Sequence, residues 1–243
     1  MIIYFSGTGN SYSVASKLRE NGEKLVSVFD EKSGKYEDER IGFVYPEYCS
    51  GLPPKMREFM EKSEFNAKYF FAVATCGASY KASLGEIEFY LKEKGKNLNY
   101  VNKLIMPDSC VLLAFPPSKV ESLLASETER VNAIREDLNR REINTIRVKK
   151  PRGAKNRFVW FLFGSVLGVY RKKSTENCVS CGKCVKACKA NNITLESGKV
   201  SFGNNCYECF ACINACPKNA IRFGAIKATD KKRYTHPCER EEG

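Results

Sequence analysis

The segments CVSCGKCVKAC, from Cys178 to Cys188, and CYECFACINACP, from Cys206 to Pro217, decide the fold of the C-terminal part of this chain. Each segment places four cysteines at successive intervals of three, three and four residues. A tight loop with a cysteine at every third position supplies three of the four thiolates that a cubane iron-sulfur cluster needs. The fourth thiolate must come from elsewhere. The sequence therefore predicts two 4Fe-4S centres, built from Cys178, Cys181, Cys184, Cys188, Cys206, Cys209, Cys212 and Cys216.

Zinc and disulfides are the two alternatives for these cysteines. Structural zinc usually takes its ligands as two separated pairs, whereas here three cysteines share one loop and the whole unit occurs twice. Disulfides need an oxidising compartment, and no secretory signal opens the sequence. Both alternatives are weaker than the cluster interpretation.

The cysteine segments resemble the bacterial two-cluster ferredoxins. In that pattern the fourth cysteine of each run serves the other cluster. The resemblance implies one centre on Cys178, Cys181, Cys184 and Cys216, and a second on Cys206, Cys209, Cys212 and Cys188. The second run keeps the family's proline, Pro217, where the first has Lys189. Ile193 and Ile221 follow their runs at the same distance, which indicates two similar halves around a shared core.

Charge is distributed unevenly along the 243 residues. Positions 1–147 hold 21 basic and 21 acidic residues, so the remainder holds 19 basic (40 − 21) and 7 acidic (28 − 21), and all of the net charge of +12 is C-terminal. Two oxidised clusters with their thiolates would offset about four of these charges. The protein stays basic, which predicts acidic docking partners or an anionic surface.

The N-terminus begins with an apolar strand, MIIYF, followed directly by SGTGNS from Ser6 to Ser11 and by a helix with Asn10 or Ser11 as its cap. A loop of glycines and hydroxyls between a parallel strand and a helix N-terminus is typical of a phosphate site. The loop lacks the lysine of nucleoside triphosphate loops and the spacing of the dinucleotide fingerprint. Its order is similar to the FMN-phosphate loop of flavodoxins. That resemblance implies FMN binding by Ser6, Thr8, Gly9, Asn10 and Ser11.

Strand and helix patterns then alternate, which predicts an α/β fold: a flavodoxin-like, doubly wound, five-stranded parallel sheet, followed by a small α+β ferredoxin-like two-cluster domain. The later predicted strands are 24–28, 40–44, 69–75 and 101–106, and the later predicted helices are 54–60, 82–94 and a closing helix or pair of helices over 120–143.

Two loops follow the third and fourth predicted strands, where ligands of such sheets bind. In flavodoxins the corresponding loops hold the isoalloxazine ring. By position the resemblance gives this role to Tyr48, Ser50, Gly51, Cys76, Gly77, Ala78 and Tyr80. An alternative is that the two tyrosines are ordinary loop aromatics and Cys76 a small buried side chain.

We expect four regions: a flavodoxin-like domain over 1–147, a basic aromatic linker over 148–173, a ferredoxin-like domain over 174–226 and a polar tail over 227–243. The segment 149–173 holds eight basic residues and no acid, and its apolar centre is too short to cross a bilayer. A packed linker, a peripheral anchor on anionic membrane and a docking element all stay open. The tail is expected to be partly disordered, with His236 in solvent.

Together the resemblances point to flavodoxin-ferredoxin fusion proteins, found mainly in anaerobic microbes. They imply electron transfer in the cytoplasm between two 4Fe-4S clusters and FMN, with ferredoxin or an oxidoreductase as an acidic redox partner. The alternative is an FMN-dependent oxidoreductase that reduces its own acceptor, such as a quinone or nitro compound. Nucleic-acid binding is disfavoured because the basic residues flank an apolar run.

Overall fold

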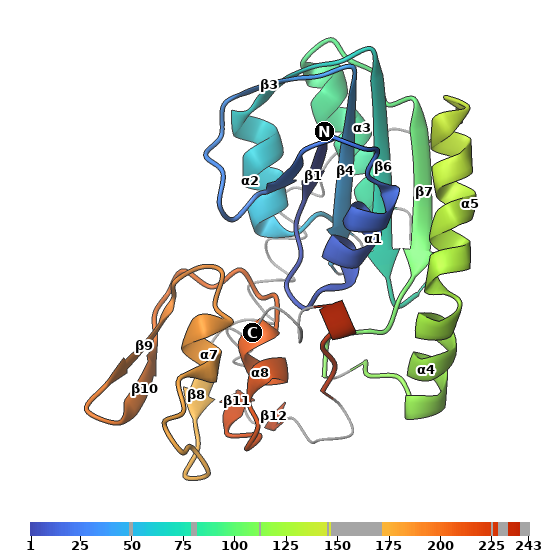
Figure 1. The fold of residues 1–243 in the computed structure, drawn as a ribbon. Coiled ribbons are helices and arrows are strands. Elements are labelled where there is room, and N and C mark those ends of the chain that lie inside the picture. Colours follow the sequence, from blue (N-terminus) through green and yellow to red (C-terminus); the bar gives the residue numbers. More distant parts are fainter. Residues whose placement is uncertain are drawn as a thin grey trace. The chain divides into compact units, whose positions relative to one another are not determined.

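The computed structural model describes residues 1–48, 51–78, 82–111, 113–144, 146, 172–224, 226–227 and 233–238 (Figure 1). The predicted linker therefore lies almost entirely outside the described residues. Contacts along the chain define two compact units. An N-terminal unit contains Met1–Pro107 and Ser118–Pro151, and a C-terminal unit contains Asp108–Pro117 and Arg152–Gly243. The short segment Asp108–Pro117 thus belongs with the C-terminal unit, although the chain returns to the first unit after it.

A five-stranded sheet forms the centre of the N-terminal unit, in the order β2-β1-β4-β6-β7. Every neighbouring pair in this sheet is parallel. Taken along the chain, these strands follow the order 2-1-3-4-5, which is the flavodoxin-like form of the doubly wound fold. The predicted fold class is confirmed for this unit. Its strands are β1 (Ile2–Tyr4), β2 (Leu25–Ser27), β4 (Arg40–Pro46), β6 (Tyr69–Cys76) and β7 (Tyr100–Ile105).

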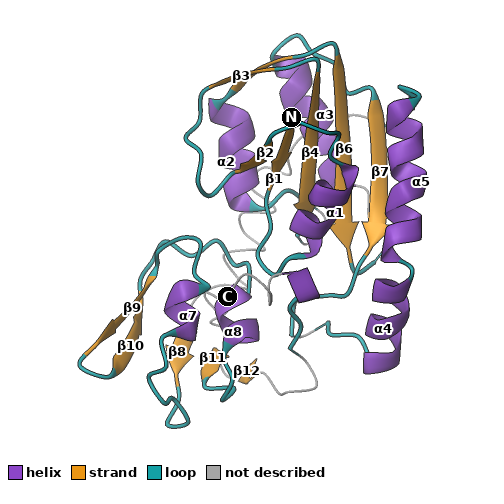
Figure 2. Ribbon diagram, viewed as in Figure 1, coloured by secondary structure: helices purple, strands orange, loops and turns teal. Residues whose placement is uncertain are grey.

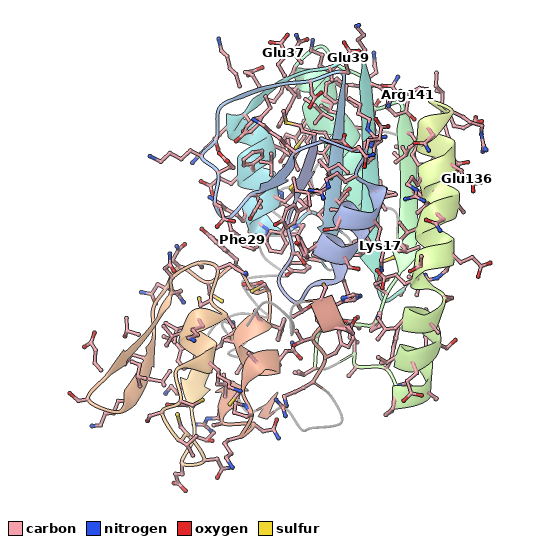
Figure 3. All side chains as sticks on the ribbon, in the orientation of Figure 1. Lys17, Phe29, Glu37, Glu39, Glu136 and Arg141 are labelled. Atoms are coloured by element: carbon pink, nitrogen blue, oxygen red, sulfur yellow. The ribbon has the colours of Figure 1, made fainter. Side chains whose placement is uncertain are left out.

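Helices cover both faces of this sheet (Figure 2). Apolar side chains of α1 (Asn10–Leu18) and α5 (Glu127–Asn139) join one core cluster with residues of β1, β4, β6 and β7. The buried carboxylate of Glu127 accepts a hydrogen bond from Ser13 and pairs with Lys17 at 2.8 Å, which joins the two helices; Lys17 is labelled in Figure 3. The remaining helices are α2 (Pro54–Lys62), α3 (Ala82–Glu93) and α4 (Pro117–Ala125).

The structure refines several sequence-based expectations. The predicted region 120–143 is a pair of helices, α4 and α5, with Ser126 between them. The N-cap of α1 is Gly9 and not Asn10 or Ser11, because Gly9 takes a left-handed conformation with φ 95° and the helix begins one residue later. A small parallel sheet of β3 (Lys35–Glu37) and β5 (Glu64–Asn66) was not expected, since three-residue strands carry almost no periodic signal.

One glycine of the central sheet sits directly under an aromatic ring. Gly42 on β4 pairs with Phe71 on β6, and a Cβ built on Gly42 would lie 2.0 Å from the Phe71 ring. The ring is fully buried, so it has no free space to move into. We expect Gly42→Ala to destabilise the N-terminal unit by about 1–3 kcal/mol, as overpacking does.

Urea unfolding midpoints measure this effect. Gly34→Ala is the control, because the nearest atom to a Cβ there is 3.9 Å away. Equal midpoints for the two variants would show that the Phe71 ring does not confine position 42.

The C-terminal unit is a small α+β structure built from two similar halves. Its described elements are β8 (Lys172–Ser174), α7 (Lys183–Lys186), β9 (Ile193–Glu196), β10 (Lys199–Phe202), α8 (Ala211–Ala215), β11 (Ile221–Phe223) and β12 (Ile226–Lys227). β9 and β10 form one antiparallel hairpin, and β8 pairs antiparallel with β11. Ile193 and Ile221 are both buried in the core of this unit.

The duplication extends to unusual backbone conformations. The two cysteine runs are offset by 28 residues, from 178 to 206, and positive-φ residues recur at the same offset. These pairs are Ser180 and Glu208, Gly182 and Phe210, and Asn191 and Asn219. Non-glycine residues rarely adopt such angles. Their repetition shows that both cysteine loops follow the same path.

The C-terminal tail departs from the expectation of a solvated segment. His236 is only 5 % exposed, so the prediction that it lies in solvent is wrong. Tyr234 is buried as well, and its backbone N–H donates to the Asn214 side chain at 2.8 Å. Asn214 also donates to the Ser109 carbonyl at 3.0 Å. One buried amide on α8 thus joins the tail and the 108–117 segment to the C-terminal unit, a long-range contact that sequence periodicity does not reveal.

Over the ranges that the structure describes, none of the helices has both the length and the apolar composition that crossing a bilayer requires.

Candidate functional site

Four cysteines from both runs line one pocket in the C-terminal unit. Cys178, Cys181 and Cys184 come from the first run, and Cys216 comes from the end of the second. The strand residue Val200 lines the same pocket. The structure therefore brings together the set that the ferredoxin resemblance assigns to one centre, with the fourth sulfur supplied by the other half.

The other four cysteines form a second group. Cys206 and Cys188 are both close enough to interact electrostatically with the Cys209 and Cys212 thiols, although Cys188 belongs to the first run. Burial raises the pKa of Cys209 to about 11 and that of Cys212 to about 12, and the neighbouring sulfurs add to the rise. Such thiols are neutral near pH 7 without a metal. Metal binding has to deprotonate them, because only thiolates are ligands.

Backbone N–H groups point at the cysteine sulfurs in both halves. Asn192 donates to the Cys188 sulfur at 3.3 Å, and Ala220 donates to the Cys216 sulfur at 3.2 Å. These donors are again 28 residues apart. Hydrogen bonds to sulfur stabilise the thiolate and the cluster it holds. No cysteine in the described part of the chain forms a disulfide. The donor set and these hydrogen bonds fit iron-sulfur clusters in both places.

The second group also contains two buried charged side chains. Lys172, only 7 % exposed, places its Nζ 3.0 Å from the Cys206 sulfur and 5.8 Å from the centre of the Phe210 ring. Burial alone lowers the pKa of Lys172, but the Cys206 and Cys212 sulfurs and Glu208 outweigh burial and raise it. Burial raises the pKa of Glu208 to about 7, against the influence of Lys172.

Sequence reasoning missed Lys172 because it grouped this residue with the basic linker. The signal that could have found it is the 28-residue offset, which places Lys172 inside the repeat and aligns it with Val200.

In the N-terminal unit, the loop from Ser6 to Ser11 is fixed at the carboxyl ends of β6 and β7. The Ser11 hydroxyl lies 2.8 Å from the Thr75 hydroxyl, and the Asn10 amide donates to the Pro107 carbonyl at 2.8 Å. Within the loop, the Gly9 N–H donates to the Ser6 hydroxyl at 3.2 Å, and Thr8 is buried. These contacts hold the loop in one shape at the edge of the sheet where ligands of this fold bind.

The geometry of the loop fits a phosphate. The first intrahelical bond of α1 runs from the Ser13 N–H to the Gly9 carbonyl. The N–H groups of the first turn therefore precede the intrahelical ladder and point out of the helix N-terminus, where a phosphate is stabilised by donors and by the helix dipole. The hydroxyls of Ser11 and Ser6 are already engaged by Thr75 and Gly9, so they shape the loop around these donors.

The two later loops are described in part. Tyr48 and Gly51 exchange backbone hydrogen bonds of 2.9 Å in an isolated antiparallel bridge, and the Tyr48 ring packs edge-on against Phe5 with 5.7 Å between the ring centres. Cys76 is buried at the end of β6 with its sulfur 3.9 Å from the Leu104 carbonyl. Gly77 is half-buried and Ala78 is exposed. Ser50 and Tyr80, which the resemblance also assigns to the flavin, lie outside the described residues.

Two carboxylates that hold these loops were missed by sequence reasoning. Glu86 on α3 is 1 % exposed, accepts from the Leu52 N–H at 3.3 Å and pairs with Arg57 at 3.2 Å. Glu47 accepts from the Ser83 hydroxyl at 3.0 Å, which joins the end of β4 to the start of α3. From sequence alone, a glutamate within a helix is expected to be exposed to solvent. Only the three-dimensional contacts show that Glu86 is buried and holds the loop at Leu52.

Comparison with known proteins supports the cluster region directly. Residues 177–221 match the family described as the 4Fe-4S dicluster domain. No curated protein matches the chain.

Among solved structures, the chain is similar to a flavodoxin from Streptococcus pneumonia TIGR4, with 17 % identity over 55 % of this chain and 97 % of that one and a TM-score of 0.33. It is also similar to an FMN-dependent NADH-azoreductase from Bacillus anthracis, with 9 % identity over 56 % of this chain and 97 % of that one and a TM-score of 0.39. The flavodoxin-like fold of the N-terminal unit is assigned from the strand order of its sheet.

The strand order and the matched domain together define the class of architecture: a flavodoxin-like α/β unit, and a small ferredoxin-like unit that contains a 4Fe-4S dicluster domain. The predicted resemblance to flavodoxin-ferredoxin fusions is confirmed at this level.

Proposed function

We propose that this protein transfers electrons between two 4Fe-4S clusters and one FMN, and so connects low-potential one-electron carriers to a two-electron flavin. The observation that carries this proposal is the convergence of eight cysteines into two sets of four, each set drawing on both halves of the repeat. The flavodoxin-like unit of the same chain supplies a phosphate-type loop at the carboxyl edge of its sheet.

The groups that would bind supply the redox chemistry, since a flavin takes up two electrons and releases them singly whereas each cluster carries one. The chain supplies the holding groups. Cysteine thiolates and backbone N–H groups hold the clusters, and the N–H groups at the start of α1 hold the FMN phosphate. Tyr48, Gly51 and the residues after Cys76 would flank the ring, with Glu86 and Glu47 keeping both loops in place.

The proposed partners are soluble redox proteins with an acidic docking face, either a ferredoxin or an oxidoreductase. The excess of positive charge in the C-terminal part of the chain supports this choice, because complementary charge steers association and sets its dependence on salt. Peripheral membrane contact through 149–173 and a cytoplasmic location remain part of the same proposal.

The test is an anaerobic stopped-flow experiment in which a reduced ferredoxin is mixed with the protein and flavin reduction is followed by absorbance. A Cys188→Ser, Cys216→Ser double variant is the comparison. We expect flavin reduction to be at least about tenfold slower in this variant. Fusion keeps the clusters at a high effective concentration relative to the flavin, and once the clusters are lost the ferredoxin has to reduce the flavin directly.

Direct photoreduction of the flavin in both proteins is the control, and it should proceed equally. An unchanged rate with ferredoxin would contradict electron flow through the clusters. Rapid steady turnover of a quinone or nitro compound, without any effect of the clusters, would instead favour an FMN-dependent oxidoreductase.

A further inference from the structure

The two halves of the C-terminal unit differ in charge at one equivalent strand position. Lys172 and Val200 are separated by the 28-residue repeat offset. Their strand partners are separated by the same offset, because Lys172 pairs with Phe223 on β11 and Val200 pairs with Leu195 on β9. The sheet register therefore shows independently that the two positions are equivalent. One half has an ammonium group here, and the other has an aliphatic side chain.

Each of these side chains lies at one of the two cysteine groups. The Lys172 Nζ is 3.0 Å from the Cys206 sulfur, in the group completed by Cys209, Cys212 and Cys188. Val200 lines the pocket of the other group, formed by Cys178, Cys181, Cys184 and Cys216. The Lys172 side chain is buried. Its Nζ donates a hydrogen bond to the Cys206 sulfur and lies 5.8 Å from the centre of the Phe210 ring.

We propose that Lys172 is a positioning residue that raises the reduction potential of the cluster held by Cys206, Cys209, Cys212 and Cys188, and so makes the two clusters unequal. This inference rests on the proposed function, since it requires that the cysteines hold clusters. Reduction adds one electron to the cluster, taken from a low-potential carrier protein, with no bond made or broken. The added negative charge is stabilised by an ammonium group in contact with a ligand sulfur.

Two physical effects act in the same direction. Hydrogen bonds to cluster sulfurs and nearby positive charge both favour the reduced state. The effect is stronger in a buried place, where the effective dielectric constant is lower than in water. Glu208 is the opposing charge in this environment, and its counterpart in the other half is Ser180. The Glu208 backbone N–H also donates to the Cys206 sulfur, at 3.4 Å. Of the two charged groups, the Lys172 ammonium is the one that donates a hydrogen bond to this sulfur, at 3.0 Å, and so it has the larger effect on the potential.

The inequality has a consequence for electron flow. When the two clusters together hold one electron, the higher potential caused by Lys172 places that electron mostly on the centre ligated by Cys206. A buried lysine that only filled space would bias neither cluster, so potentials distinguish the two roles.

The experiment is an anaerobic redox titration of the whole protein, with the two clusters followed by electron paramagnetic resonance. We expect Lys172→Met to move one of the two reduction waves to lower potential and to leave the other in place. In Lys172→Arg, which keeps the positive charge, this reduction wave should stay close to its native potential. Lys173→Met removes the same charge from the adjacent, exposed residue and should move neither wave appreciably.

Val200→Lys provides a reciprocal test that does not depend on the folding of the Lys172 variants. It should raise the wave that Lys172→Met leaves unmoved. The inference is overturned if Lys172→Met shifts neither wave or if Val200→Lys leaves both waves in place. It is also overturned if Lys173→Met shifts the same wave as much as Lys172→Met does. Two clusters with potentials insensitive to Lys172 would refute this inference and leave the proposed function intact, whereas a protein without iron would refute the proposed function itself.

Discussion

Cys216→Ser is expected to remove about four of about eight irons per chain, since each cubane holds four. The lost irons should be those of the centre whose other ligands lie in the first run. Cys216 lies in the second run, but it lines the pocket of Cys178, Cys181 and Cys184. Serine is a poor ligand for iron compared with a thiolate, and the remaining three sulfurs leave one corner open. Iron and acid-labile sulfide analysis, made without oxygen, measures the loss.

Double variants identify which centre has been lost. Adding Cys178→Ser to Cys216→Ser should cost no further iron, because both residues serve the same centre. Adding Cys206→Ser should remove the remaining four irons or nearly so. Such non-additivity is expected only for residues that act as one unit. Cys110→Ser is the control, since Cys110 is a cysteine of the same unit outside both groups. The reverse pattern of losses would overturn the crossed ligation.

Gly9→Ala is expected to weaken FMN binding by about tenfold or more. Gly9 has φ 95°, and an L-residue in the left-handed region costs about 1–2 kcal/mol, which corresponds to roughly a tenfold change in affinity. Relief of this strain moves the Gly9 N–H away from the Ser6 hydroxyl and disturbs the first turn of α1. Titration of the flavin-free protein with FMN, followed by quenching of flavin fluorescence, gives the dissociation constants.

Gly22→Ala is a matched control for this variant. Gly22 also has a positive φ, of 78°, and no atom lies within 4 Å of a Cβ built there. It precedes β2, so it lies at the amino ends of the strands and away from the loop. The two variants therefore carry a similar backbone strain, and only Gly9→Ala should weaken FMN binding. Equal dissociation constants for the two variants would exclude the Ser6–Ser11 loop as the phosphate site.

Much of the N-terminal fold is predictable from sequence because its strands are apolar and its loops carry strong glycine signals. The strand Tyr69–Cys76 is buried at every position, and the sequence predicts it over 69–75 as a continuous apolar run. What escaped prediction depends on long-range contacts. The supporting role of Glu86 depends on the Leu52 N–H that donates to it, and the burial of His236, which is only 5 % exposed, follows no local sequence pattern.

In the C-terminal unit, too, the repeated sequence pattern predicts some features, and others depend on packing alone. The cysteine spacing predicts both groups, since ligation restricts the spacing of the cysteines. The spacing says nothing about the side chains between and before the runs. Lys172 carries no motif, and its importance appears only when the strand register aligns it with Val200 beside the other group. Similarly, the 108–117 segment carries no signal that it packs with residues a hundred positions away.

The most direct test of the central claim is the cofactor content of the protein purified without oxygen, measured as iron, acid-labile sulfide, zinc and flavin. The account predicts about eight irons, about eight sulfides and one FMN per chain, because two cubanes contain four irons and four sulfides each. Zinc in place of iron, or iron without any flavin, would contradict it.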